Sequence, residues 1–151
     1  MTLDERPENR LECWHPQRGL LHTTELPAMA TSIHATEDGA IVGCQNGAIL
    51  RFRIGKEVEE LLIVDNSVSS IIQWEQDLII GTWFNAKRIS SSGDIIWSYE
   101  HEGIVTEILE IGSDLITVIG RSPTGQKPAS IVLLEPNSEP TIPEDESYVY
   151  E

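Results

Sequence analysis

Short runs of isoleucine, valine and leucine alternate with polar residues along most of the chain. No eleven-residue window keeps the spacing of an amphipathic helix. The apolar runs are bounded by Gly, Asp, Asn and Ser, which favour turns. β-branched side chains suit a pleated, half-buried strand better than a helix. The pattern therefore predicts short antiparallel strands and little helix.

The strand pattern repeats with a period of about 38 residues. The blocks 32–36 and 39–43 recur as 70–74 and 77–81, and Gly55 recurs 38 residues later as Gly93. A third copy begins at 107–111 and continues at 114–118, and its second half diverges into a turn-rich insertion. An N-terminal half copy surrounds Gly19. The strands predicted in the two full copies are 31–36, 40–45, 48–54 and 57–64, then 68–75, 78–83, 86–90 and 94–100.

Four antiparallel strands in about 38 residues make one blade of a β-propeller. The sequence therefore predicts an all-β chain of about three four-stranded propeller-type blades. An open β-sandwich and a β-meander remain the alternatives, because three blades alone cannot close a ring. The predicted divisions are an extension at 1–10, a half blade at 11–30, blades at 31–67 and 68–103, a divergent blade at 104–135, and an acidic, Pro-rich tail at 136–151.

Two segments resemble a known superfamily. The hairpin at 38–50, with its Asn46-Gly47 turn, resembles the second and third strands of quinoprotein-like (PQQ-like) and WD-repeat-like propellers. The segment Gly93-Asp94-Ile95-Ile96-Trp97 is similar to the Gly-x-x-x-Trp of the quinoprotein-like repeat. The resemblance covers about residues 11 to 135 and implies that Trp97 docks between adjacent blades. Glu59 stands where the first copy would repeat this tryptophan. We expect no quinone or other cofactor, because the chain is too short for a closed ring.

Composition narrows the classes of partner. The formal net charge is −15, with ten basic residues scattered along the chain, so nucleic acid is not an expected partner. No apolar run is long enough to span a membrane. The two cysteines, Cys13 and Cys44, lack paired spacing and no secretory signal precedes them. We therefore expect reduced thiols and a cytoplasmic location.

Catalytic and metal chemistry have weak support in the sequence. Cys13, His15 and His22 lie close together, but zinc sites need three or four converging ligands. The run at 90–92 reads as a turn, because none of its serines lies in a Gly-x-Ser-x-Gly motif. We therefore expect no metal site, no catalytic residues and no enzymatic activity. The alternative is a subunit that contributes His34 and Gln73 to an enzyme or small-ligand site at a ring centre.

The turns offer better candidates for recognition. Trp83 and Phe84 occupy a connection between two strands, where two bulky rings are unusual, whereas Trp74 and Trp97 are expected in blade packing. In propellers, the connections after the second and fourth strands lie on one face, and loops on a rigid scaffold often carry recognition. Asp65 and Asn66 fall on that face. The residues predicted to bind a partner there are Gln45, Asn46, Trp83, Phe84, Asn85, His101, Glu102 and Arg121.

The incomplete first and last copies predict that the array needs a neighbour. Repeats bury their faces against adjacent repeats, so an array of three must cap its ends or borrow a blade. We therefore expect a non-catalytic interaction or scaffold module that completes a ring by self-association or with a partner protein.

Overall fold

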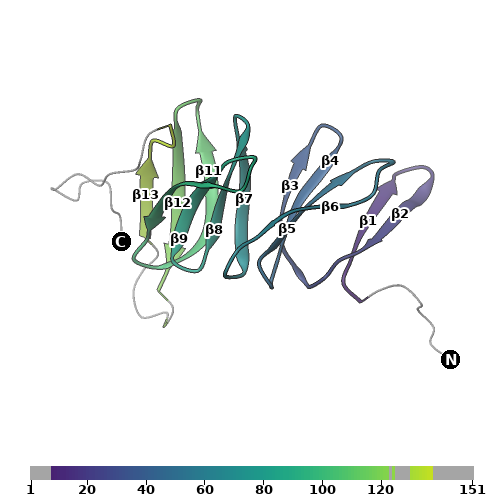
Figure 1. Ribbon diagram of the computed structural model, residues 1–151, viewed down its shortest axis with the longest axis horizontal. Coiled ribbons are helices and arrows are strands. Elements are labelled where there is room, and N and C mark those ends of the chain that lie inside the picture. Colours follow the sequence, from purple (N-terminus) through teal and green to yellow (C-terminus); the bar gives the residue numbers. More distant parts are fainter. Residues whose placement is uncertain (1–7, 123, 125–129, 138–151) are drawn as a thin grey trace.

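The computed structural model describes residues 8–122, 124 and 130–137. These residues form thirteen strands in four antiparallel sheets and contain no helix (Figure 1). A two-stranded half blade consists of β1 (Arg10–His15) and β2 (Gly19–Glu25). The other sheets are blade 1, with β3 (Ala30–Thr36), β4 (Gly39–Cys44), β5 (Ala48–Arg53) and β6 (Glu59–Ile63); blade 2, with β7 (Val68–Trp74), β8 (Asp77–Thr82), β9 (Asn85–Ile89) and β10 (Ile95–Glu100); and blade 3, with β11 (Ile104–Ile111), β12 (Leu115–Arg121) and β13 (Ser130–Leu134).

The all-β fold predicted from the repeat is confirmed. All eight strands predicted in the two full copies are present, and their ends differ from the predicted ones by no more than two residues. Blade 3 has three strands within the described residues, so its second half departs from the repeat as its sequence does. No helix long and apolar enough to cross a membrane occurs in the described part of the chain.

The sheets lie face to face in chain order, with an apolar cluster at each junction (Figure 1). Leu11 of the half blade packs on a cluster that includes Val42 and Leu50 of blade 1. Ile41 and Ile49 of blade 1 meet the facing residues of blade 2. The largest cluster joins blades 2 and 3 and contains Trp74, Ile79, Trp97, Tyr99, Val105, Ile108, Ile116, Val118, Val132 and Leu134. Successive junctions of this kind distinguish the fold from a two-layer sandwich.

Trp97 is almost fully buried in the junction between blades 2 and 3, which confirms the position that the family resemblance implied. Its indole Nε1 donates to the carbonyl oxygen of Pro136 at 2.9 Å. Trp74 Nε1 donates to Asn137 Oδ1 at 2.8 Å, and Arg88 Nη1 donates to the Pro136 carbonyl at 2.7 Å. The first two residues of the predicted tail are therefore held against blade 2. The rest of it, 138–151, lies outside the described residues.

A bulge recurs near the start of the first strand of each blade. The register shifts between Ala30 and Ser32, and equivalent shifts occur in β7 and β11. The bulged residue carries a hydroxyl in every case, and that hydroxyl donates to a carbonyl oxygen of the second strand. The pairs are Thr31 with Gly43, Ser69 with Gly81, and Thr106 with Ile119, at 3.1–3.2 Å. The first two strands of the three blades are thus equivalent position by position.

Glycine in the second strand lets neighbouring blades approach closely. A Cβ at Gly43 would lie 2.6 Å from Val68 Cγ1 of blade 2, and a Cβ at Gly81 would lie 2.8 Å from Val105 Cγ1 of blade 3. Real side chains do not approach so closely, because van der Waals repulsion rises steeply at these distances. The two glycines, 38 residues apart, therefore occupy the same position in two successive junctions between blades.

Candidate functional site

The connections after the second and fourth strands gather on one face, as the propeller topology predicts. The amide of Val64, after β6, donates to the carbonyl oxygen of Gly47 in the β4–β5 turn at 2.9 Å. The amide of His101, after β10, donates to the carbonyl oxygen of Phe84 in the β8–β9 turn at 2.6 Å. These bonds tie each turn to the connection that leads into the next blade. We call this surface the loop face.

Trp83 is the most unusual residue of the loop face. It stands with Phe84 in the two-residue turn between β8 and β9, whose ends pair Thr82 with Asn85. Its φ is 48°, in a region that bulky residues rarely adopt. Two-residue hairpin turns that match strand twist need positive φ, which glycine, asparagine and aspartate supply at least cost. A tryptophan at this position is therefore a strained choice of residue.

The strained turn nevertheless presents its indole to solvent. The Trp83 side chain is 53% exposed, and its ring lies 5.8 Å from that of the half-buried Phe84. The backbone of the turn is held from below, because the amide of Val105 donates to the Trp83 carbonyl oxygen at 2.6 Å. The backbone of the turn is thus held by hydrogen bonds to the next connection, while the Trp83 indole stays exposed.

The other predicted residues of the loop face differ in accessibility. Gln45, Asn46, Glu102 and Arg121 are exposed, and Asn85 is half-buried at the first position of β9. The Asn46 Oδ1 accepts a hydrogen bond from the amide of Ala48 at 3.0 Å, so its side chain shapes the β4–β5 turn. Apart from His101, the predicted residues therefore lie at the β4–β5, β8–β9 and β10–β11 connections and at the end of β12.

His101 is the exception, because its side chain is only 2% exposed. The Nε2 atom lies 2.8 Å from the buried Ser130 hydroxyl, and Nδ1 has no hydrogen-bond partner among the residues that the structure describes. Burial lowers the pKa of His101, although the bond to Ser130 opposes this effect. The imidazole is packed so closely on Gly120 that a Cβ there would lie 2.3 Å from its Cδ2 atom. His101 is thus an interior residue that joins blade 3 to the connection before it, and its ring is not part of the exposed surface.

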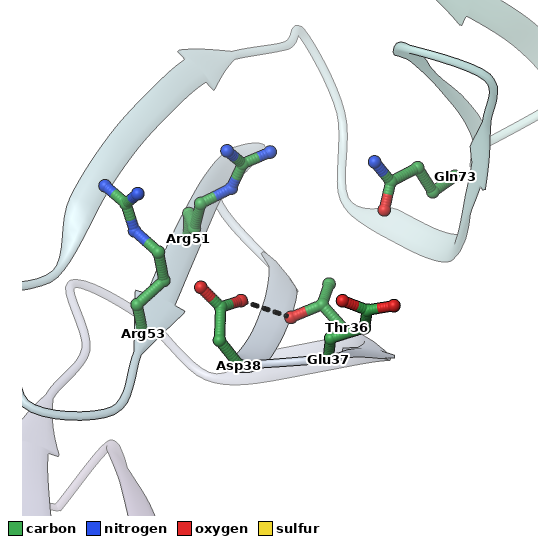
Figure 2. Close-up of a pocket in the computed structure, with 6 residues that line it drawn as sticks. All are labelled: Thr36, Glu37, Asp38, Arg51, Arg53 and Gln73. Carbon is green, nitrogen blue, oxygen red and sulfur yellow. Dashed lines mark hydrogen bonds between the residues drawn. The ribbon is translucent and has the colours of Figure 1, made fainter.

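A concave region lies at the junction of blades 1 and 2. Figure 2 shows its lining, in which the two arginines come from one strand and the acidic residues come from the β3–β4 turn. The cavity measures about 370 Å³ and is lined by Thr36, Glu37, Asp38, Arg51, Arg53 and Gln73.

Two side chains that line this groove have polar partners. Arg53 pairs with Glu59 at 3.3 Å, and Asp38 Oδ1 accepts from the Thr36 hydroxyl at 3.3 Å. Gln73, predicted near a ring centre, lines the groove. His34 lies on the side of blade 1 that faces blade 2, since its cross-strand partner Ile41 packs there. Sequence reasoning missed the arginines, although their spacing of two in a strand places them on one face.

The histidines and cysteine of the half blade have ordinary structural partners. Cys13 pairs with His22 across the hairpin, and His22 stacks on Phe52 with ring centroids 5.5 Å apart. His15 Nδ1 accepts from the amides of Gln17 and Arg18 at 3.1 and 3.2 Å and so closes the β1–β2 turn. The described residues include no group of three or more His, Cys, Asp or Glu side chains placed to hold a metal ion.

Comparison with known proteins identifies the type of fold and does not identify a family or a function. No protein family matches the chain, and no curated protein is similar to it in sequence. Solved structures do match it. The computationally designed Ika8 protein is 13% identical, with a TM-score of 0.64 over 81% of this chain and 38% of its own length. BamB from Moraxella catarrhalis is 11% identical, with a TM-score of 0.64 over 86% of this chain and 41% of its own.

The computationally designed Ika4 protein is 11% identical, with a TM-score of 0.56 over 71% of this chain and 67% of its own length. The chain thus spans about two fifths of the length of Ika8 and of BamB. At such low identity the likeness concerns backbone arrangement only. The chain has a propeller-like fold, formed by a half blade and three further blades stacked in order.

Proposed function

We propose that the chain is a non-catalytic interaction module that binds a partner protein through the loop face, with Trp83 and Phe84 at the centre of the contact. The observation that carries this proposal is the exposed tryptophan in a backbone conformation that suits glycine. Strained conformations persist where the surrounding structure imposes them, and they cluster at functional sites. Tryptophan is also the residue type most enriched among residues that dominate binding energy.

The charge of the chain indicates the chemistry of the partner. The chain has a net charge of −15, and Glu102 lies in the connection next to the aromatic turn. Opposite charge at the rim of an interface speeds association and rejects acidic competitors. The expected partner segment is therefore an apolar or aromatic anchor flanked by lysine or arginine. Its binding should weaken as salt concentration rises.

Selection from a library of random peptides displayed on phage tests this proposal directly. The immobilised full chain serves as bait, and the enriched peptides are then synthesised and titrated in solution. We expect peptides with basic flanks whose affinity falls about 30-fold in Trp83→Ala, because dominant interface residues contribute about 2 kcal/mol or more.

Trp14 provides the matched control. Its side chain is 60% exposed on β1, so Trp14→Ala removes an equally accessible indole from a different surface. This variant should change the affinity of the same peptides by less than about threefold, a change of under 1 kcal/mol. Peptides that bind both tryptophan variants as well as they bind the native chain would place the interaction elsewhere and refute the proposed site.

A further inference from the structure

Arg51 is a half-buried cation at the junction of blades 1 and 2. It follows Ile49 by two residues in β5, and Ile49 packs in the apolar cluster between these blades, so both side chains lie on the face of β5 that meets blade 2. Gln73 follows Ile71 of the same cluster in the same way in β7. The two polar side chains therefore face one junction from opposite blades. Figure 2 shows the Gln73 amide pointing toward the Arg51 guanidinium.

The acidic residue opposite Arg51 is bonded to a different arginine. Glu59 in β6 is paired in register with Arg51 in β5, and opposite charges at such positions attract each other. However, Glu59 Oε2 bonds to Nη2 of Arg53 at 3.3 Å. Within the described residues the Arg51 side chain has neither an ion pair nor a hydrogen bond. A charge that is partly removed from water is stabilised by an opposite charge, so this guanidinium attracts an anion.

Arg51 and Gln73 lie where two cavities meet. Both residues line the groove of about 370 Å³ and a smaller cavity of about 140 Å³. Leu61, Leu62 and Leu78 line the smaller cavity, and all three belong to the apolar cluster of the junction or pack on it. A cation and an amide donor thus stand beside an apolar surface. A ligand with an anionic group at one end and a short hydrocarbon chain at the other matches this arrangement.

We propose that this junction binds a small organic carboxylate, whose oxygens accept hydrogen bonds from Arg51 and Gln73 and whose apolar chain contacts the three leucines. The planar guanidinium suits a carboxylate, because it can donate two parallel hydrogen bonds to it. Glu37 and Asp38 line the larger cavity, and Glu59 lines the smaller one. These acids repel a doubly charged phosphate more strongly than a singly charged carboxylate. The lining thus favours a monocarboxylate over a phosphate.

The carboxylate site is independent of the partner surface around Trp83. It includes the β3–β4 turn, which lies at the opposite end of β4 from the β4–β5 turn of the loop face. Loss of carboxylate binding therefore leaves the binding of the phage-selected peptides unchanged, and loss of peptide binding in Trp83→Ala leaves the carboxylate site unchanged.

Titration of the isotope-labelled full chain with hexanoate, followed by NMR, tests the proposal. We expect saturable shifts of the Arg51 Nε and Gln73 side-chain amide signals, and an affinity that falls as salt concentration rises. Acetate lacks the apolar chain and hexanamide lacks the charge, so each should bind about tenfold more weakly than hexanoate. Inorganic phosphate should also bind more weakly than hexanoate.

Substitutions at the junction test the role of each charge. Arg51→Gln should weaken hexanoate binding about tenfold, because it removes the charge-assisted hydrogen bonds. Arg18→Gln is the matched control, since it removes the same charge from the exposed β1–β2 turn, and it should bind hexanoate as the native chain does. Glu59→Gln tests the opposite direction. It releases Arg53 and removes a nearby negative charge, so the affinity for hexanoate should rise about threefold.

Three results would overturn the proposal. The first is the absence of saturable shifts at Arg51 and Gln73, and the second is equal affinity for hexanoate in Arg51→Gln and Arg18→Gln. The third is binding of hexanamide or phosphate as tight as that of hexanoate, which would assign the site to apolar contact alone or to phosphate groups.

Discussion

Gly81 offers a direct test of how closely the blades are packed. In an ordinary strand, Gly→Ala stabilises a protein by about 0.5–1 kcal/mol, because alanine loses less backbone entropy on folding. Here the added Cβ would lie 2.8 Å from Val105 Cγ1 and 2.9 Å from Ser69 Oγ. Val105 is fully buried and has no room to withdraw. Overpacking of this kind costs about 1–3 kcal/mol, so the sign of the usual effect is reversed.

The clash is located by removing the atom that causes it. Val105→Ala alone should cost about 2 kcal/mol, from lost apolar burial and the cavity that it leaves. Combined with Gly81→Ala, it makes space for the new methyl group, so the double variant should be more stable than the sum of the single effects predicts. The expected coupling is about 1 kcal/mol or more, within the range for residues in contact.

Urea unfolding of the four proteins, followed by tryptophan fluorescence, measures these free energies. Trp97 lies in the same junction and reports its exposure. An unchanged or increased stability for Gly81→Ala would refute the close approach of the two blades. Additive single and double effects would show that the cost arises somewhere other than at Val105.

Three further predictions concern other parts of the chain. Burial lowers the pKa of His101 below its value in the unfolded chain, so the unfolded state binds the proton more readily. The free energy of unfolding should therefore decrease as pH falls through about 6.5, by at most about 1.4 kcal/mol per pH unit. Urea midpoints measured across pH should show this dependence in the native chain and not in a His101→Asn variant. Arg88→Met removes the bonds to Asp77 and to the Pro136 carbonyl, and limited proteolysis should then cleave near Asn137 faster than in the native chain. Trp83→Asn should unfold at an equal or higher urea concentration than the native chain, since asparagine tolerates positive φ, and a marked loss of stability would show that the indole is needed for folding.

The spacing of small residues explains why the blades follow one another in a fixed geometry. Gly43 and Gly81 meet Val68 and Val105, and a hydroxyl at each bulge bonds to the carbonyl beside the contact. Ile119 breaks this series at the last blade. A single position, in the same register of three blades, thus carries glycine where the next blade lies close and isoleucine in blade 3.

The loop face has one feature that could be predicted from the sequence and one that could not. The Trp83-Phe84 turn was predictable, because its position between two apolar runs and its lack of turn-forming residues are visible in the sequence. The burial of His101 was not, since it follows from contact with Gly120 and Ser130 in the next blade. The burial of a side chain in a connection depends on how closely the next sheet packs against it. The spacing of residues along the sequence does not give the distance between that side chain and the next sheet.

The sequence alone determined the strands, their antiparallel order and the period of the blades, because alternation of apolar residues and turn-forming glycines act between residues that are close along the chain. Only the tertiary structure decided which faces meet and which residues stay exposed. For example, Ile33 is 62% exposed, whereas Ile71 is 4% exposed. Both occupy the same position of the repeat, but burial depends on whether another sheet lies opposite.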